Sequence, residues 1–219
     1  MNIVLFGAQG SGKGTQAEKL VATFHCHHIS SGDIFRDAFE DGSELGRVAH
    51  SYIERGELVP DDITVEMMLQ RITQPDIARA GFILDGFPRT IAQAKALDEG
   101  LAKLGREIDC SVYLDVPRAE LIKRLSGRYI CKAHQHVYNV RTNPPKVAGI
   151  CDIDGSELYQ RTDDQGSAIE KRLDIFFSET IQLLDYYRAQ NKLLHIDGNR
   201  DIDEVSADLI EKLKKYLSR

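Results

Sequence analysis

The stretch GAQGSGKGT, residues 7–15, decides the fold because of what lies on either side of it. It follows NIVLF (2–6), an apolar run typical of a buried strand, and leads into GTQAEKLVATF (14–24), whose apolar residues recur at helical spacing. Its four glycines allow positive φ and let backbone N–H groups approach phosphate oxygens at the positive end of the helix. Lys13 then lies within reach of the β and γ phosphates of a nucleotide. The stretch therefore predicts a phosphate-binding loop between a strand and a helix.

Four further runs have the composition of buried strands, and stretches with helical periodicity lie between them. The runs are HHIS (27–30), GFILD (81–85), SVYLDV (111–116) and KLLHI (192–196). Most are continuously apolar instead of alternating, which is typical of strands buried on both faces of a parallel sheet. We therefore predict an α/β fold whose core is a doubly wound, parallel, five-stranded sheet carrying the glycine loop.

Two segments interrupt the alternation of strands and helices. Residues 31–60 are mostly helical in pattern and polar, and residues 127–164 contain a cluster of cysteine and histidine together with several turn signals. We interpret both as insertions, the second small and β-rich, into a core formed by residues 1–30, 61–126 and 165–219.

Composition limits the functions that the chain can have. Its 219 residues, 42% of them hydrophobic, are enough for one sizeable core, and the net charge of −6 with dispersed basic residues argues against a dedicated nucleic-acid binder. No apolar run approaches the length of a membrane span, and the first residues lack the pattern of a cleaved leader. Four cysteines are too sparse for a disulfide framework. We expect a cytoplasmic protein without a membrane partner.

The stretch GFILDGFPRT (81–90) predicts a second group of ligand-binding residues. Asp85 ends a buried strand and should face the same crevice as the glycine loop, where it could orient Mg²⁺ through the water shell of the ion. Arg89, held between a proline and a helix start, presents a planar fork suited to phosphate. The alternatives are that Asp85 caps the next helix and that Arg89 forms a surface ion pair.

Five motifs together resemble the adenylate kinase family across essentially the whole chain. In order they are GAQGSGKGT (7–15), SSGDIFR (30–36), DGFPRTIAQ (85–93), SGR (126–128) and YQRTDD (159–164) with KRL (171–173). The resemblance implies reversible phosphoryl transfer between Mg·ATP and AMP to give two ADP. It also implies that residues 31–60 bind AMP and that residues 127–164 form a lid over ATP. Nucleotides are then the expected partners of a monomeric enzyme.

The resemblance also assigns the site residues. It places Lys13, Asp85, Arg89, Arg124, Arg161 and Arg172 in catalysis. It places Gly10, Ser11, Gly12, Lys13, Gly14, Thr15, Arg124, Arg128, Val137, Tyr138 and Arg200 at ATP. It places Ser31, Arg36, Glu57, Leu58, Val59, Gly86, Phe87, Pro88, Arg89, Gln93, Arg161 and Arg172 at AMP, where the amide of Gln93 would read adenine.

Physical chemistry explains why such a site needs many cations. Two polyphosphates repel each other, and phosphoryl transfer leaves the protein mainly the tasks of positioning and neutralising charge. Asp163 and Asp164 should orient these arginines or cap the helix that follows. Val137 and Tyr138 could equally belong to the core of the lid.

Residues 127–164 also contain a candidate metal site. Cys131 and His134 are separated by two residues, as are Cys151 and Asp154, and the two pairs have zinc-ribbon spacing. These four ligands would hold a closed, structural Zn²⁺, with His136 as a substitute ligand. Within the resembled family, the alternative at these positions is a metal-free polar network.

Two other functions remain open from the sequence. A related enzyme could use GTP as the donor or another monophosphate as the acceptor, although Gln93 favours adenine and the long 127–164 insertion disfavours a short-lid kinase. The second alternative is not an enzyme: an ATP-responsive module could bind nucleic acid through a zinc ribbon. The net negative charge of the chain disfavours this function.

Overall fold

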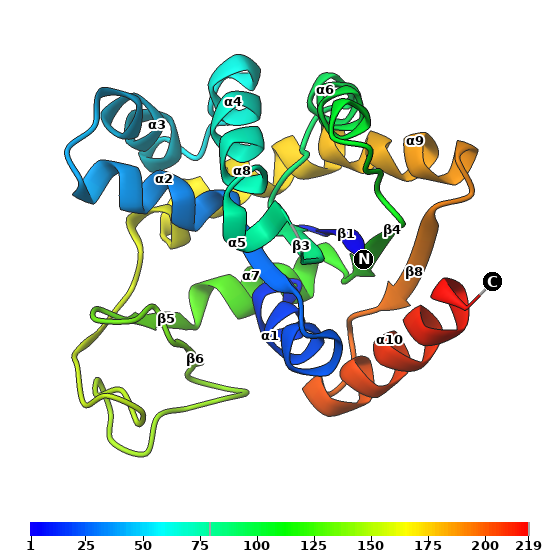
Figure 1. Ribbon diagram of the computed structural model, residues 1–219. Helices are drawn as coiled ribbons and strands as arrows, with labels where there is room; N and C mark the ends of the chain where they lie inside the picture. Colours follow the sequence, from blue (N-terminus) through cyan, green and yellow to red (C-terminus); the bar gives the residue numbers. More distant parts are fainter. Residues whose placement is uncertain (79, 219) are drawn as a thin grey trace.

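The computed structural model describes residues 1–78 and 80–218, and its centre is a parallel five-stranded sheet (Figure 1). The strand order is β2-β3-β1-β4-β8. The strands are β1 (Asn2–Phe6), β2 (His27–Ser30), β3 (Phe82–Asp85), β4 (Cys110–Asp115) and β8 (Leu193–Asp197). All five predicted runs form strands within one residue of their expected bounds.

The central strand β1 shows why its sequence is apolar at every position. All five of its residues are buried, and its neighbours β3 and β4 pair with it in parallel. Val4 and Phe6 belong to one hydrophobic cluster, whereas Ile3 and Leu5 belong to another on the opposite face. The sheet is therefore covered on both faces, as predicted.

Two groups of helices cover the faces of the sheet. Leu97, Leu121 and Leu173 pack on the face of Val4, and Leu20 and Leu209 pack on the face of Ile3. Among the described residues, no helix is both long and apolar enough to cross a membrane. The helices are α1 (Lys13–Phe24), α4 (Asp61–Ile72), α5 (Pro75–Ala78), α6 (Ile91–Lys103), α7 (Arg118–Ser126), α8 (Gly166–Ser178), α9 (Leu183–Ala189) and α10 (Ile202–Leu217), with 3₁₀ turns at Thr162–Asp164 and Thr180–Gln182.

Residues 31–60 form a helical pair, as predicted. Helix α2 (Ser31–Glu40) is capped by Ser30, whose hydroxyl accepts from the N–H of Asp33 at 3.2 Å. Helix α3 (Glu44–Glu54) is capped in the same way by Ser43. The pair packs with Met67 of α4 in an apolar cluster around Phe35.

Residues 127–164 form a second, antiparallel sheet that extends from the core at the lower left of Figure 1. Its strand order is β6-β5-β7, with β5 (Arg128–Cys131), β6 (Val137–Asn139) and β7 (Leu158–Tyr159). Its buried cluster is small, consisting of Cys131, Tyr138, Cys151 and Leu158. The segment is β-rich, as predicted. That the two insertions act as separate domains stays a prediction.

Candidate active site

The glycine loop joins the end of β1 at Phe6 to the start of α1 at Lys13. Gly10 and Gly12 have φ of +82° and +95°, so both positions need glycine. Among the described residues, no side chain caps α1, and a Cβ added to Gly12 would meet no atom within 4 Å. In the part of the chain that the structure describes, the first turn of α1 therefore has no side-chain cap, and there is free space beside Gly12, as an anion site at a helix N-terminus requires.

Lys13 folds back onto this loop. Its Nζ donates to the carbonyl oxygens of Gly7 at 2.9 Å and Ala8 at 3.1 Å. Removal from water lowers the pKa of Lys13 to about 8; Asp85 opposes the shift, and nearby arginines, Arg89 foremost, add to it. The ammonium thus lies in a strongly cationic environment that favours an anion.

Asp85 lies at the carboxyl end of β3, opposite Leu5 of β1 and Ser30 of β2. Burial alone would raise its pKa, but contact with His28 and the charge of Lys13 lower the pKa overall, so the carboxylate is ionised. His28 Nε2 lies 3.4 Å from Asp85 Oδ2 and was not anticipated from the sequence. An ionised carboxylate beside the glycine loop suits a hard divalent cation.

The contacts of Thr90 exclude the alternative that Asp85 caps the next helix. Helix α6 begins at Ile91, and the hydroxyl of Thr90 caps it by accepting from the N–H of Gln93 at 3.1 Å. Asp85 therefore does not cap this helix. It remains available to the crevice above the sheet.

Arg89 is turned inward, so it does not form a surface ion pair. Its Nε donates to the carbonyl oxygen of Gly86 at 2.7 Å. Burial, followed by the charge of Arg172, lowers its pKa to about 10. The peptide bond between Phe87 and Pro88 is cis.

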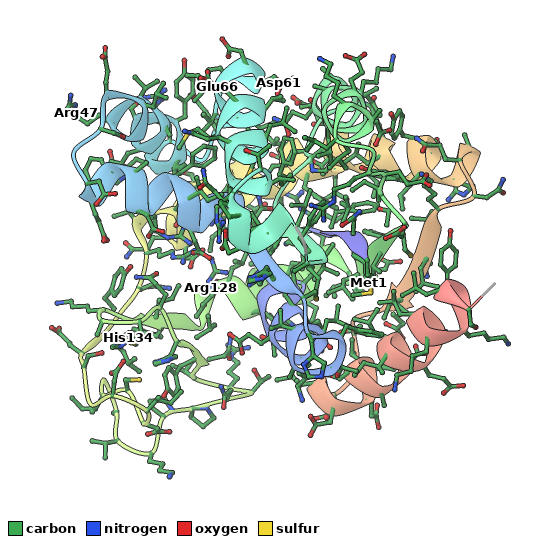
Figure 2. All side chains as sticks on the ribbon, in the orientation of Figure 1. Met1, Arg47, Asp61, Glu66, Arg128 and His134 are labelled. Atoms are coloured by element: carbon green, nitrogen blue, oxygen red, sulfur yellow. The ribbon has the colours of Figure 1, made fainter. Side chains whose placement is uncertain are left out.

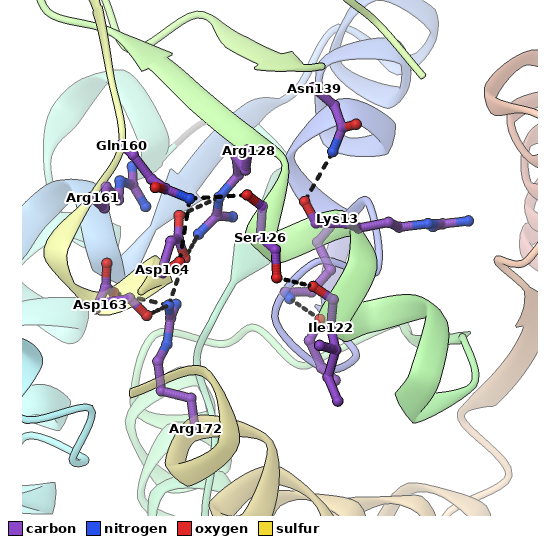
Figure 3. Close-up of polar contacts among 12 residues, drawn as sticks. Lys13, Ile122, Ser126, Arg128, Asn139, Gln160, Arg161, Asp163, Asp164 and Arg172 are labelled. Atoms are coloured by element: carbon purple, nitrogen blue, oxygen red, sulfur yellow. Dashed lines mark hydrogen bonds and ion pairs between the residues drawn. The ribbon is translucent and has the colours of Figure 1, made fainter. Parts of the chain in front are cut away.

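Asp164 gathers two of the predicted arginines (Figure 3). Arg128 binds it with a fork, Nε to Oδ2 at 2.7 Å and Nη2 to Oδ1 at 2.6 Å. Arg172 Nη1 donates to Asp164 Oδ1 at 2.8 Å and to the carbonyl oxygen of Asp163 at 2.7 Å. Burial would raise the pKa of Asp164, but the positive charges, Arg128 foremost, lower it overall. Of the two predicted roles, Asp164 has the first: it orients the arginines.

Arg161 keeps a buried donor unused. Its Nη2 donates to Gln135 Oε1 at 3.3 Å, while its buried Nε has no partner among the described residues. Burial, then the charges of Arg36 and Arg128, lowers its pKa to about 10. An unpartnered buried donor among like charges indicates a place for an anionic ligand.

The remaining predicted arginines also have protein partners. Arg36 pairs with Asp33, and Arg124 donates to the carbonyl oxygen of Gly198 at 3.2 Å. Arg200 binds Asp208 at 2.6 Å. All six arginines assigned to catalysis or to phosphate binding in ATP and AMP therefore donate to a protein oxygen.

Gln93 is fixed by contacts that the sequence did not reveal. Its Nε2 donates to Asp61 Oδ1 at 2.6 Å, and its Oε1 accepts from the N–H of Arg89 at 2.7 Å. Thr90 Oγ1 donates to the other oxygen of Asp61 at 2.9 Å. Each polar atom of the amide retains capacity for one more hydrogen bond, so the side chain can still read an adenine edge.

The other residues assigned to the AMP side come from α2 and the segment before α4. Ser31 Oγ donates to the carbonyl oxygen of Gly86 at 2.9 Å, and Glu57 accepts from Lys171 Nζ at 2.8 Å. Val59 is buried, and Leu58 is partly buried. The segment 57–59 is thus tied to α8 through Lys171.

Tyr138 and Val137 differ in position. The ring of Tyr138 lies in the lid cluster, and its hydroxyl accepts from the N–H of Asp152 at 2.8 Å. Val137 is 48% exposed. Of the two side chains, therefore, only that of Val137 is free to meet a ligand.

Three of the four predicted metal ligands, together with His136, gather in the 127–164 segment. Cys131 Sγ, Cys151 Sγ, His136 Nδ1 and an oxygen of Asp154 all lie within 4.8 Å of one another. The ring of the predicted ligand His134 instead contacts Asp154, with Nδ1 2.8 Å from Oδ2. Figure 2 shows His134 out in the lid, beyond Arg128.

The donor set of this cluster fits Zn²⁺. Two thiols, an imidazole and a carboxylate are the groups that tetrahedral zinc sites use. Burial would raise the pKa of Cys131, but the hydroxyl of Ser156 and the N–H of His134 stabilise the thiolate and lower the pKa to about 7. Both sulfurs are buried and free of disulfide bonds.

Comparison with known proteins agrees with this geometry. A model of the adenylate kinase family matches residues 5–192. The adenylate kinase of Syntrophomonas wolfei subsp. wolfei is 52% identical over 214 residues, which cover 98% of this chain and 99% of that protein. The adenylate kinase of Staphylococcus epidermidis is 49% identical over 97% of this chain and 99% of its own length. The adenylate kinase of Carboxydothermus hydrogenoformans is 48% identical over 98% of this chain and 100% of its own length. The chain belongs to the adenylate kinase family.

Proposed function

We propose that this protein transfers a phosphoryl group reversibly between Mg·ATP and AMP, giving two ADP. The observation that carries the proposal is the clustering of cations at the uncapped N-terminus of α1: the charges of Arg89, Arg128 and Arg172 act on Lys13, beside Asp85. Arg36 and Arg172 act in turn on Arg89. Family membership over nearly the whole chain supports the same reaction. In it, the γ-phosphorus bond to ADP breaks as a bond to a phosphate oxygen of AMP forms.

The residues divide into three tasks. The amides of the loop and Lys13 hold the donor phosphates, and the arginines neutralise the charge where the two nucleotides meet. Asp85 would hold the water shell of Mg²⁺, which when bound neutralises the outer phosphates. We assign no general base, because the attacking phosphate of AMP is already an anion.

Donor and acceptor choice is tested with a coupled assay. ATP, GTP and UTP are each supplied with AMP, and AMP, GMP, CMP and UMP are each supplied with ATP. Because the Gln93 amide presents a donor and an acceptor, we expect AMP to exceed the other acceptors by at least ~10²-fold in kcat/KM. Equal turnover of GMP or CMP would refute the AMP assignment, and comparable rates with GTP would establish the alternative donor.

Arg89→Ala tests the arginine cluster directly. The loss of an inward-facing charge at the transferring group should lower kcat/KM by ~10²–10³-fold without a large change in melting temperature. Arg188→Ala is the matched control, because that arginine is exposed and pairs with Asp185 within its own helix. If the two variants were equally active, Arg89 would have no role at the phosphates.

We further propose that the lid holds one structural Zn²⁺ and that the enzyme is a cytoplasmic monomer. The support for zinc is the cluster of sulfur, imidazole and carboxylate ligands in a segment whose apolar core is very small. Metal analysis should find one zinc per chain, lost in Cys131→Ser. A protein purified without metal, and unaffected by added zinc, would support the polar network instead.

A further inference from the structure

The lid cluster contains two histidines, but a closed tetrahedral site with two cysteines and one carboxylate has room for only one imidazole. The sequence spacing selects His134, because its two-residue gap from Cys131 repeats the gap between Cys151 and Asp154. We propose that His136 is instead the imidazole ligand and that His134 is an outer partner holding Asp154. The inference rests on the lid metal proposed above.

The distances around His136 are those of a metal site. Its Nδ1 lies 3.5 Å from Cys131 Sγ, 3.3 Å from Cys151 Sγ and 3.3 Å from Asp154 Oδ2. With Zn–S bonds of about 2.3 Å and Zn–N and Zn–O bonds of about 2.0 Å, a tetrahedral ion separates nitrogen from sulfur by about 3.5 Å and nitrogen from oxygen by about 3.3 Å. The three distances from His136 are therefore those that one bound ion would require. Cys131 Sγ and Asp154 Oδ2, 3.1 Å apart, would have to separate to about 3.5 Å.

The strand register explains why His136 points into the cluster. Ile130 pairs with Val137 across the hairpin, so Cys131 and His136 are the next opposed residues, and the N–H of Cys131 donates to the carbonyl oxygen of His136 at 2.9 Å. Side chains of directly opposed residues lie on the same face of a hairpin. Gln135, with φ of +59°, makes the reversal that brings His136 back onto the strand.

His134 lies in the turn and makes different contacts. Its backbone N–H, not its ring, reaches sulfur, at 3.2 Å from Cys131 Sγ. Its ring Nδ1 contacts the carboxylate of Asp154. The side chain of His134 is 67% exposed, whereas that of His136 is 29% exposed. Both contacts are those of a partner that steadies a metal ligand from outside.

The second hairpin explains why the spacing misleads. Cys151 is opposed by Ser156 there, as Cys131 is opposed by His136. Ser156 donates its hydroxyl to Cys131 Sγ at 3.2 Å and its N–H to Asp154 Oδ1 at 2.8 Å. The hairpin after Cys151 thus contributes the short side chain of Asp154 from its turn, whereas the hairpin after Cys131 contributes the longer side chain of His136 from the position opposite Cys131. Sequence spacing alone treats the two hairpins as equivalent.

The test uses the full-length protein loaded with ¹¹³Cd²⁺ and with Zn²⁺. A ¹¹³Cd–¹H correlation spectrum reports scalar coupling only through metal–ligand bonds, and the chain has 7 histidines to assign. We expect coupling to the ring protons of His136 and none to those of His134.

Zinc affinity of two variants gives a second readout, measured by competition with a chromophoric chelator. His134→Ala should keep one zinc per chain with an affinity weaker by ~10–100-fold, as for an outer partner. His136→Ala should weaken zinc binding further, by more than ~10²-fold, and the two side chains make a matched pair in one hairpin.

The possible failures are distinct. Cadmium coupling to His134, with zinc lost from His134→Ala and retained by His136→Ala, overturns the ligand assignment alone. A wild-type chain that takes up neither ion overturns the lid metal and this inference together. Phosphoryl transfer is measured separately and stands or falls on the coupled assay.

Discussion

Lys13 donates to two carbonyls of its own loop while burial and neighbouring arginines lower its pKa to about 8. The folded state therefore binds fewer protons than the unfolded state between pH 8 and 10.5, the ordinary pKa of a lysine. The unfavourable contribution of the charged lysine is fully present below pH 8, and it disappears as the pH rises to 10.5. The residue that should hold the donor phosphates thus destabilises the nucleotide-free protein.

Replacing Lys13 with Met removes this penalty. At pH 7 the variant should be more stable than the loss of two hydrogen bonds alone would predict. Between pH 8 and 10.5 the free energy of unfolding of the wild type should rise, relative to that of the variant, by up to about 3 kcal/mol. Urea denaturation of both proteins in phosphate-free buffer measures this difference, in which the other titrating groups cancel. A difference that stays constant with pH would mean that the lysine is not desolvated.

At the scale of single elements, the sequence predicts what depends on local pattern. The five strands follow from continuous apolar runs, and the glycine loop follows from its position between a strand and a helix. Contacts between distant segments leave no local mark: Asp61 lies 32 positions from Gln93, and His28 approaches Asp85 only because β2 pairs with β3. Spacing predicts His136 only as a substitute ligand, because its position opposite Cys131 depends on hairpin register and not on spacing.

Helix α4 supplies a test of one such contact. Asp61→Ala should free the Gln93 amide and raise KM for AMP by roughly 10-fold, with KM for ATP unchanged, because the adenine-reading side chain would lose its fixed orientation. Asp62→Ala is the control, since both acids lie in the first turn of α4 and interact similarly with its dipole. Steady-state kinetics with each nucleotide varied would decide, and an equal rise of KM in both variants would point to the dipole.

In the molecule as a whole, Asp164 ties the 127–164 segment to helix α8 of the core. Arg128 begins the first lid strand and Arg172 lies in α8, and both donate to this one carboxylate, whose side chain is 0% exposed. Both ends of the 127–164 segment are therefore tied to one buried group. Any movement of the lid must turn about it or break it.

Asp164→Asn should destabilise the nucleotide-free protein by about 3–5 kcal/mol, because two arginines lose a buried partner. By thermal denaturation this is a drop of roughly 10 °C in Tm. Adding AMP with a non-transferable ATP analogue should raise the Tm of the variant by more than that of the wild type, since phosphate oxygens can replace the lost carboxylate. Asp174→Asn is the control, as its exposed carboxylate pairs with Arg118 on the surface.

The protein acceptors that already pair with the six arginines affect how nucleotide affinity depends on salt. A bare patch of cations would gather mobile ions from solution and release them when a nucleotide arrives, which makes affinity fall steeply with ionic strength. In this protein, the carboxylates of Asp33, Glu120 and Asp164 are fixed in the chain and act as built-in counterions for four of the six arginines. For those four, binding a nucleotide exchanges protein carboxylates for phosphate oxygens, so affinity should fall less with added salt than six free arginines would suggest.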